Sequence, residues 1–119
     1  MIELSHKNLT VWKKSLLLAK EMYTLTSKFP PEEKFGLTSQ LRRAAVSVLS
    51  NLAEGAARKS DADKARFFII ARSSLVEIDS QIELVKLLSY TSIDDFDKLT
   101  QLANDVFAML TKLIQKYGK

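Results

Sequence analysis

A set of polar residues within residues 40–60 has the types and the spacing that could form a binding site. The set is Arg43, Ser47, Ser50, Asn51, Glu54 and Arg58. An α-helix brings residues three or four positions apart onto one face, so these groups could bind an anion, bond to a neighbouring helix or simply face solvent. Gly55 disfavours a helix by about 1 kcal/mol relative to Ala, a cost that close packing of another helix would explain. We therefore rank an internal polar network above a ligand site.

Residues suited to catalysis or metal binding are scarce. The sequence contains no Cys and one His, His6, which lies near the N-terminus. Thiolate metal sites and a Cys nucleophile are thereby excluded, and no glycine-rich phosphate loop is present. The acids of residues 94–97 fall at a predicted helix start, where they stabilise the positive end of the helix dipole. We expect no enzyme activity, no cofactor and no metal.

Basic residues offer a second chemistry, the binding of nucleic-acid phosphates. Residues 1–60 carry ten Lys and Arg against five Asp and Glu, whereas residues 61–119 carry eight against nine. Clustered cations are sufficient to bind backbone phosphates without reading sequence. The candidates are Arg42, Arg43, Arg58, Lys59, Lys64, Arg66 and Arg72. Phe67 and Phe68 are predicted core residues, so stacking on bases is not expected. An equally weighted alternative to nucleic-acid binding is that these basic residues are simply solvated.

The elements that must position these residues are predicted to be four helices. Apolar residues recur with helical periodicity over residues 9–29, 31–58, 61–90 and 93–117, and only three Gly and two Pro interrupt the chain. Gly36 also allows a short turn after Pro31, followed by a restart capped by Thr38. Ser60 and Ser92 are each followed three residues later by Asp, the signature of a helix start. Short connections between long helices predict one domain of 119 residues, an up-down-up-down four-helix bundle.

The two middle helices carry more apolar surface than one bundle can bury. Each has a second apolar arc outside its core stripe, a pattern that usually marks an interface. The residues of these arcs are Val46, Leu49, Ala53, Ala57, Ile69, Val76, Leu84 and Leu87. Arg42 borders the arc of the second helix, whereas Arg43 belongs to its polar face. We therefore expect a homo-oligomer.

Neither a signal-peptide pattern nor an apolar run of about 20 residues occurs in the sequence. We expect a soluble cytoplasmic protein with no membrane partner.

Several motifs together resemble a known family. "VW", "FP..E..GL", "QLRRAAVS", "SN.AEG..R" and "SL.E" occur in this order within residues 9–90. The combination resembles the bacterial four-helix bundle proteins, which include products of reading frames inserted in large-subunit ribosomal RNA genes. Relatives of the accessory protein of diversity-generating retroelements are also members. The predicted fourth helix matches this family only in its apolar pattern.

The resemblance implies a homopentameric ring with a basic surface, nucleic-acid binding, and in some relatives association with a reverse transcriptase. The matching polar positions are Arg42, Arg43, Ser47, Asn51, Glu54, Gly55, Arg58, Ser74 and Glu77, with Leu75 beside them. Two departures affect the contact between the second and third helices. Leu49 stands where the family often has Pro, which predicts a less kinked helix. Ser73 stands where the family often has Gly, which predicts a looser contact or an added hydrogen bond.

These observations favour a non-enzymatic, oligomeric bundle that binds RNA or DNA electrostatically, alone or beside a nucleic-acid enzyme. The alternative is a protein–protein adaptor or scaffold whose polar ribbon on the second helix docks a partner and whose charge is incidental.

Overall fold

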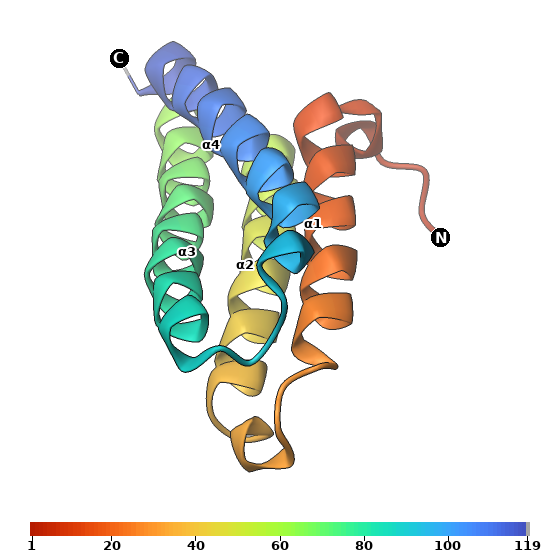
Figure 1. The fold of residues 1–119 in the computed structure, drawn as a ribbon. Helices are drawn as coiled ribbons and strands as arrows, with labels where there is room; N and C mark the ends of the chain where they lie inside the picture. The colour runs from red at the N-terminus through yellow and green to blue at the C-terminus, as the bar shows by residue number, and fades with distance from the viewer. Residues whose placement is uncertain (119) are drawn as a thin grey trace.

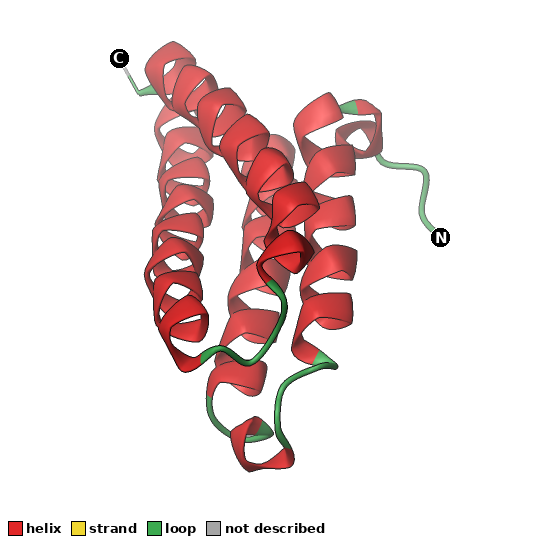
Figure 2. Cartoon of the chain, in the orientation of Figure 1, coloured by secondary structure: helices red, strands yellow, loops and turns green. Residues whose placement is uncertain are grey.

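The computed structural model describes residues 1–118, which form four long α-helices. The helices are α1 (Thr10–Thr26), α2 (Leu37–Ala57), α3 (Asp61–Leu88) and α4 (Asp97–Tyr117), with 3-10 turns η1 (Ser5–Asn8), η2 (Pro31–Glu33) and η3 (Ile93–Phe96). Successive helices run in opposite directions (Figure 1), and residues 1–118 contain no strand (Figure 2). The predicted all-α, up-down-up-down four-helix bundle is confirmed.

Two helix starts form where the cap signatures predicted them. The Ser60 hydroxyl accepts a 3.1 Å hydrogen bond from the Asp63 N–H at the start of α3. Ser92 and Asp95 form a reciprocal capping box at η3, in which the Ser92 N–H donates to Asp95 Oδ2 at 3.1 Å. These bonds satisfy N–H groups that a helix start leaves without an intrahelical partner.

The first predicted helix was too long, because α1 ends at Thr26 and not near residue 29. The Lys28 and Phe29 N–H groups bond three residues back, to Leu25 and Thr26, so the last turn tightens. Pro30 causes this ending, since it lacks an N–H group and disfavours the helical conformation for the residue before it.

The second predicted helix is divided, which confirms the alternative of a short turn after Pro31 followed by a restart. A 3-10 turn, η2, begins at Pro31, and α2 begins only at Leu37, after Gly36 adopts a φ of −110° and a ψ of −118°. The cap predicted at Thr38 is wrong. Glu33 Oε1 accepts from the Leu37 N–H at 3.2 Å and takes that role instead.

The remaining boundaries differ less. Helix α3 ends at Leu88, where Ser89 adopts the left-handed conformation with a φ of 56°, and α4 follows a 3-10 turn in place of a regular first turn. Helix α2 ends at Ala57, and it is continuous through Leu49, as the absence of Pro predicted. The Ser73 hydroxyl donates to the Ile69 carbonyl at 2.9 Å, so it adds a bond within α3.

The core lies between the four helices, each of which packs chiefly on the two helices next to it in the bundle. Its fully buried side chains include Leu18, Met22, Leu41, Val48, Leu52, Phe68, Val85, Val106 and Leu110. Burial of each large apolar side chain contributes about 1.5–3 kcal/mol. Leu16 and Tyr23 of α1 and Phe107 of α4 belong to the apolar sides of their helices but are exposed, because a neighbouring helix covers those broad sides only in part.

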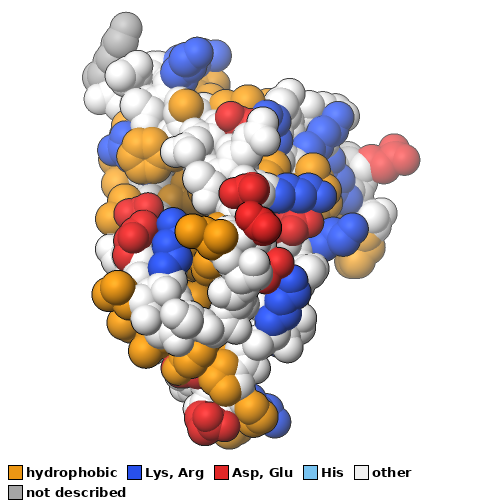
Figure 3. All heavy atoms as spheres, viewed as in Figure 1, with side chains coloured by type: hydrophobic (Ala, Val, Ile, Leu, Met, Phe, Trp, Pro, Cys, Tyr) orange, Lys and Arg blue, Asp and Glu red, His pale blue; other side chains and the backbone are white. Residues whose placement is uncertain are grey.

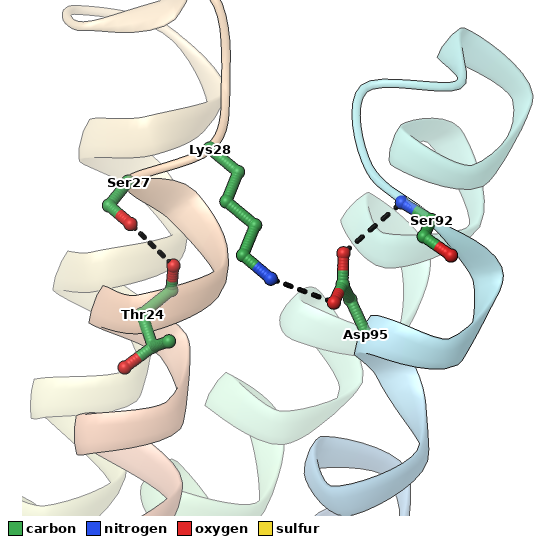
Figure 4. A network of polar contacts seen from close by, with 5 residues as sticks. All are labelled: Thr24, Ser27, Lys28, Ser92 and Asp95. Carbon is green, nitrogen blue, oxygen red and sulfur yellow. Dashed lines mark hydrogen bonds and ion pairs between the residues drawn. The ribbon is translucent and has the colours of Figure 1, made fainter.

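The α1–α2 and α3–α4 connections lie at the same end of the bundle (Figure 1). Lys28 Nζ and Asp95 Oδ1 form an ion pair of 2.7 Å there, and Asp95 also accepts from the Ser92 N–H (Figure 4). The hydrogen bond from Lys28 holds the pKa of Asp95 below its usual value.

Within residues 1–118, no helix combines the length and the apolar composition that crossing a lipid bilayer requires.

Candidate nucleic-acid interface

Part of the polar face of α2 forms hydrogen bonds within the protein. Ser47 Oγ lies 2.9 Å from Ser74 Oγ of α3. The Asn51 amide donates to the Ser47 carbonyl at 2.9 Å and to the Ser47 hydroxyl at 3.0 Å. All three side chains are half-buried. This arrangement joins α2 to α3 and matches the internal network that the sequence favoured over a ligand site.

Glu54 and Glu77 lie outside that network, although the family motif includes them. Glu54 Oε2 pairs with Arg58 Nη2 at 3.2 Å on the surface of α2. Glu77 Oε1 accepts from the Gln81 amide at 3.3 Å. Among the predicted polar positions, the structure thus joins Ser47, Asn51 and Ser74 in one network and pairs Glu54 separately with Arg58.

Gly55 lies where α2 meets the first turns of α3. A Cβ atom at Gly55 would lie 2.7 Å from Phe68 Cε1 and 3.1 Å from Phe67 Cβ. Only glycine therefore allows this close approach of the two helices. The neighbouring Phe67 is half-buried and lies outside the core cluster, so its prediction as a core residue is wrong.

A terminal basic cluster, formed by Arg58, Lys59, Lys64 and Arg66, lies at the turn from α2 to α3. The Phe67 ring contacts two guanidinium groups, with centroid distances of 4.7 Å to Arg58 Cζ and 4.8 Å to Arg66 Cζ. Lys64 Nζ donates to the Ala56 carbonyl at 3.0 Å, which satisfies one of the last carbonyl groups of α2. Cation–π contacts restrict both arginines, so two positive charges are held side by side.

Acidic residues moderate this cluster. Glu54 pairs with Arg58, Asp63 lies 3.8 Å from Arg66, and Asp61 opens α3 nearby. Both ion pairs are exposed, and exposed pairs contribute about 0–1 kcal/mol. A phosphate can therefore displace them, although the carboxylates repel it. Lys116 of α4 belongs to the same end of the bundle, since Lys64 and Lys116 both lie near the Tyr117 ring; the sequence offered no signal for this neighbour.

The other predicted basic residues lie apart from the terminal basic cluster. The Arg42 guanidinium donates from Nε to Thr26 Oγ1 at 2.8 Å and lies 4.5 Å from the Tyr23 ring centroid, so it anchors α2 to α1. Arg43 is exposed. Arg72 Nη1 donates to Thr111 Oγ1 of α4 at 3.2 Å. The seven cations do not form one surface.

The residues predicted for an oligomer interface divide between two faces. Val76 lines a depression between α3 and α4, with Phe107 on the opposite wall. Val46 instead lines a groove with Tyr23 of α1. On α3, Val76 is 54% and Leu87 85% exposed, and Ile69 and Leu84 are also exposed, whereas Leu49 and Ala53 of α2 are half-buried and Ala57 is exposed. Figure 3 shows apolar side chains gathered along the α3 edge of the molecule.

A third feature was missed by sequence reasoning. Lys34 and Phe35, in the turn between η2 and α2, line the groove that also holds Tyr23, Arg42 and Arg43. Phe35 is 88% exposed. An aromatic residue inside the turn "KFG" was a usable signal, because a turn offers it no helical face to bury. Within residues 1–118, no group of three or more His, Cys, Asp and Glu converges as metal ligands.

The fold and these surfaces define a small helical bundle whose exposed features are basic and apolar patches. More specifically, the chain matches the 23S rRNA-intervening sequence proteins over residues 7–112 and belongs to that family. A protein of unknown function from the S23 ribosomal protein family of Bacteroides thetaiotaomicron has a similar crystal structure. It is 22% identical, with a TM-score of 0.81 over 88% of this chain and 98% of the other, which establishes the shared fold. No curated protein matches the chain.

Proposed function

We propose that this protein binds RNA or DNA through its basic surface and acts without catalysis of its own, in the cytoplasm. The observation that carries the proposal is the terminal basic cluster, where Arg58 and Arg66 contact the ring of Phe67 at 4.7 and 4.8 Å. Restricted guanidinium groups lose little side-chain entropy on contacting a phosphate. Lys59 is exposed beside them and adds charge. Membership of a family encoded within ribosomal RNA genes agrees with a nucleic-acid partner.

We propose further that copies of the chain associate through the α3–α4 face. Ile69, Val76 and Leu87 are exposed apolar residues of α3, and Phe107 is 41% exposed on α4. A homopentamer is the assembly that the family resemblance implies. Assembly would repeat the weak basic cluster in one particle, and linked weak sites bind far more tightly than a single site.

Binding is tested by fluorescence anisotropy with labelled RNA and DNA of mixed sequence over a range of salt concentrations. The affinity should fall linearly with salt on logarithmic axes, because phosphate contacts release counterions. The R58E/R66E variant should abolish binding at moderate salt. The K13E/K20E variant changes the net charge equally on exposed positions of α1 and should retain more of the affinity. Absence of binding at low salt would refute the proposal.

Self-association is tested by size-exclusion chromatography with light scattering. Val76→Asp should lower the measured mass, because a carboxylate would be buried in the contact. Gln101→Asp, an exposed position on α4, should leave the mass unchanged. A monomeric wild-type protein at micromolar concentration would contradict the assembly.

A protein partner is the second candidate function, and the α3–α4 depression favours it. Asp79 and Asn104 lie beside Val76 and Phe107 there, so the surface combines apolar area with polar groups, as protein interfaces do. A reverse transcriptase or another enzyme acting on nucleic acid is the partner that the family resemblance implies. Nucleic-acid binding that is absent alone but appears with such an enzyme would favour this role.

A further inference from the structure

The groove between the end of α1 and the start of α2 has an unusual lining. Two exposed aromatic residues, three cations and the hydroxyl groups of Thr38 and Ser39 meet there. The lining residues are Tyr23, Lys34, Phe35, Thr38, Ser39, Arg42, Arg43 and Val46. No acidic residue is among them, in contrast to the terminal basic cluster.

The aromatic residues of this α1–α2 groove are accessible. Phe35 is 88% exposed and Tyr23 is 46% exposed. Both rings therefore present surface to solvent that a ligand can contact. Phe67 and Phe68, the aromatic residues considered for base stacking from the sequence, cannot stack on a base. Phe68 is buried, and Phe67 is flanked by two guanidinium groups.

The cations of the groove are placed next to the rings. The Arg42 guanidinium lies 4.5 Å from the Tyr23 centroid and is fixed by its hydrogen bond to Thr26. Lys34 Nζ lies 5.4 Å from the Phe35 centroid. Arg43 is exposed on the next position of α2 and lines the same groove. Rings for bases and charges for phosphates therefore alternate over a short surface.

We propose that the α1–α2 groove binds single-stranded RNA or DNA, with an unpaired base stacked on Phe35 and phosphates bound by Lys34 and Arg43. The inference rests on the proposed nucleic-acid function and adds the strand form and the site. Stacking on a protein ring needs a base with a free face, which single strands present and the interior of a duplex does not. Tyr23 with its stacked Arg42 provides a second flat surface, since guanidinium planes also stack on bases.

The test compares a labelled single-stranded oligonucleotide with a hairpin duplex of matched length, using the full chain and fluorescence anisotropy. The single strand should bind more tightly. Phe35→Ala should weaken single-strand binding by about 5- to 150-fold, the range measured for loss of a base–aromatic stack, and should leave duplex binding unchanged. Phe35→Trp should retain the affinity. A 2-aminopurine base in the strand should lose fluorescence on binding to the wild type and not to Phe35→Ala.

Controls separate this site from other uses of the same surface. Ile93→Ala removes a side chain that is 78% exposed in η3 and does not line the groove, so it should bind as the wild type does. The binding site would be refuted if Phe35→Ala and Ile93→Ala lost affinity equally, or if Phe35→Ala bound as the wild type does. If R58E/R66E weakens single-strand binding while Phe35→Ala binds as the wild type does, the proposed function stands and the groove is refuted. A change of mass in Phe35→Ala would assign the ring to a second copy of the chain and also overturn the inference.

Discussion

The Tyr90 hydroxyl donates a 2.7 Å hydrogen bond to Glu33 Oε2, which links the end of α3 to the turn before α2. The other oxygen of the same carboxylate accepts from the Leu37 N–H at 3.2 Å. A Cβ atom on Gly36 would lie 2.6 Å from that oxygen, so a larger residue there would displace the Glu33 carboxylate from its position. Glu33 thereby holds both ends of the turn that carries Lys34 and Phe35.

Tyr90→Phe should lower the stability of the protein at neutral pH and not at high pH. The hydrogen bond to Glu33, with burial adding to it, raises the pKa of Tyr90 above its usual value. The stabilisation is therefore complete below the ordinary tyrosine pKa of about 10 and is lost as the pH rises through the raised folded-state pKa. Urea midpoints of the two proteins should differ at about pH 7 and converge once the pH has risen past the raised pKa of Tyr90. A difference that persists unchanged at high pH would contradict this account.

Gly55→Ala should destabilise the protein, although Ala favours a helix by about 1 kcal/mol. The added methyl group would contact the Phe68 ring at 2.7 Å, and such overpacking costs about 1–3 kcal/mol. We expect a net loss of about 0–2 kcal/mol in chemical denaturation. Ser50→Ala on the exposed side of α2 serves as the control and should stay within about 0.5 kcal/mol. Stabilisation by Gly55→Ala would contradict this account, because it would mean that α3 can move away from the added methyl group with no loss of stability.

Arg42→Ala and Arg43→Ala should differ in stability despite their adjacent positions. Arg42 bonds to Thr26 and stacks on Tyr23 of α1, whereas Arg43 is exposed. Loss of a hydrogen bond to a charged group costs about 1.5–3 kcal/mol, so Arg42→Ala should unfold at clearly lower urea concentration. Arg43→Ala should change the unfolding free energy by less than about 0.5 kcal/mol. Equal midpoints would remove the assigned role of Arg42 in joining the helices.

Glu54→Gln should increase nucleic-acid affinity. Its carboxylate pairs with Arg58 at 3.2 Å and repels any phosphate that approaches the terminal basic cluster. Removing one negative charge should strengthen binding several-fold at low salt, and the gain should shrink as salt screens the interaction. Titration of the same oligonucleotide with the wild type and with Glu54→Gln measures the difference in affinity. Weaker binding would mean that Glu54 orients Arg58 for the contact.

The number and type of the elements were predictable because they depend on residues close together in the chain. Apolar periodicity located four helices, and the Ser60 and Ser92 signatures located two helix starts that formed as expected. The end of α1 at Thr26 and the start of α2 at Leu37 were less well predicted. There the competing effects of Pro30, Gly36 and Glu33 decide which residue begins or ends a helix.

The candidate sites were predicted less completely, because residues of one type were grouped by their closeness in sequence. Helical geometry separated Arg42 from Arg43 correctly, since adjacent helix residues point about 100° apart. It could not show that Arg72 would bond to Thr111, 39 residues away. Nor could it show that Val46 and Val76 would line different depressions.

The sequence by itself determined an all-helical bundle, its core stripes and an excess of positive charge in the first half of the chain. Only the tertiary structure decided which charges meet which rings. Phe67 contacts Arg58 across the α2–α3 turn, and Tyr23 of α1 contacts Arg42 of α2. The reason is physical: periodicity sets the face of a helix on which a side chain lies, whereas the neighbour it meets depends on how distant helices pack and how their connections turn.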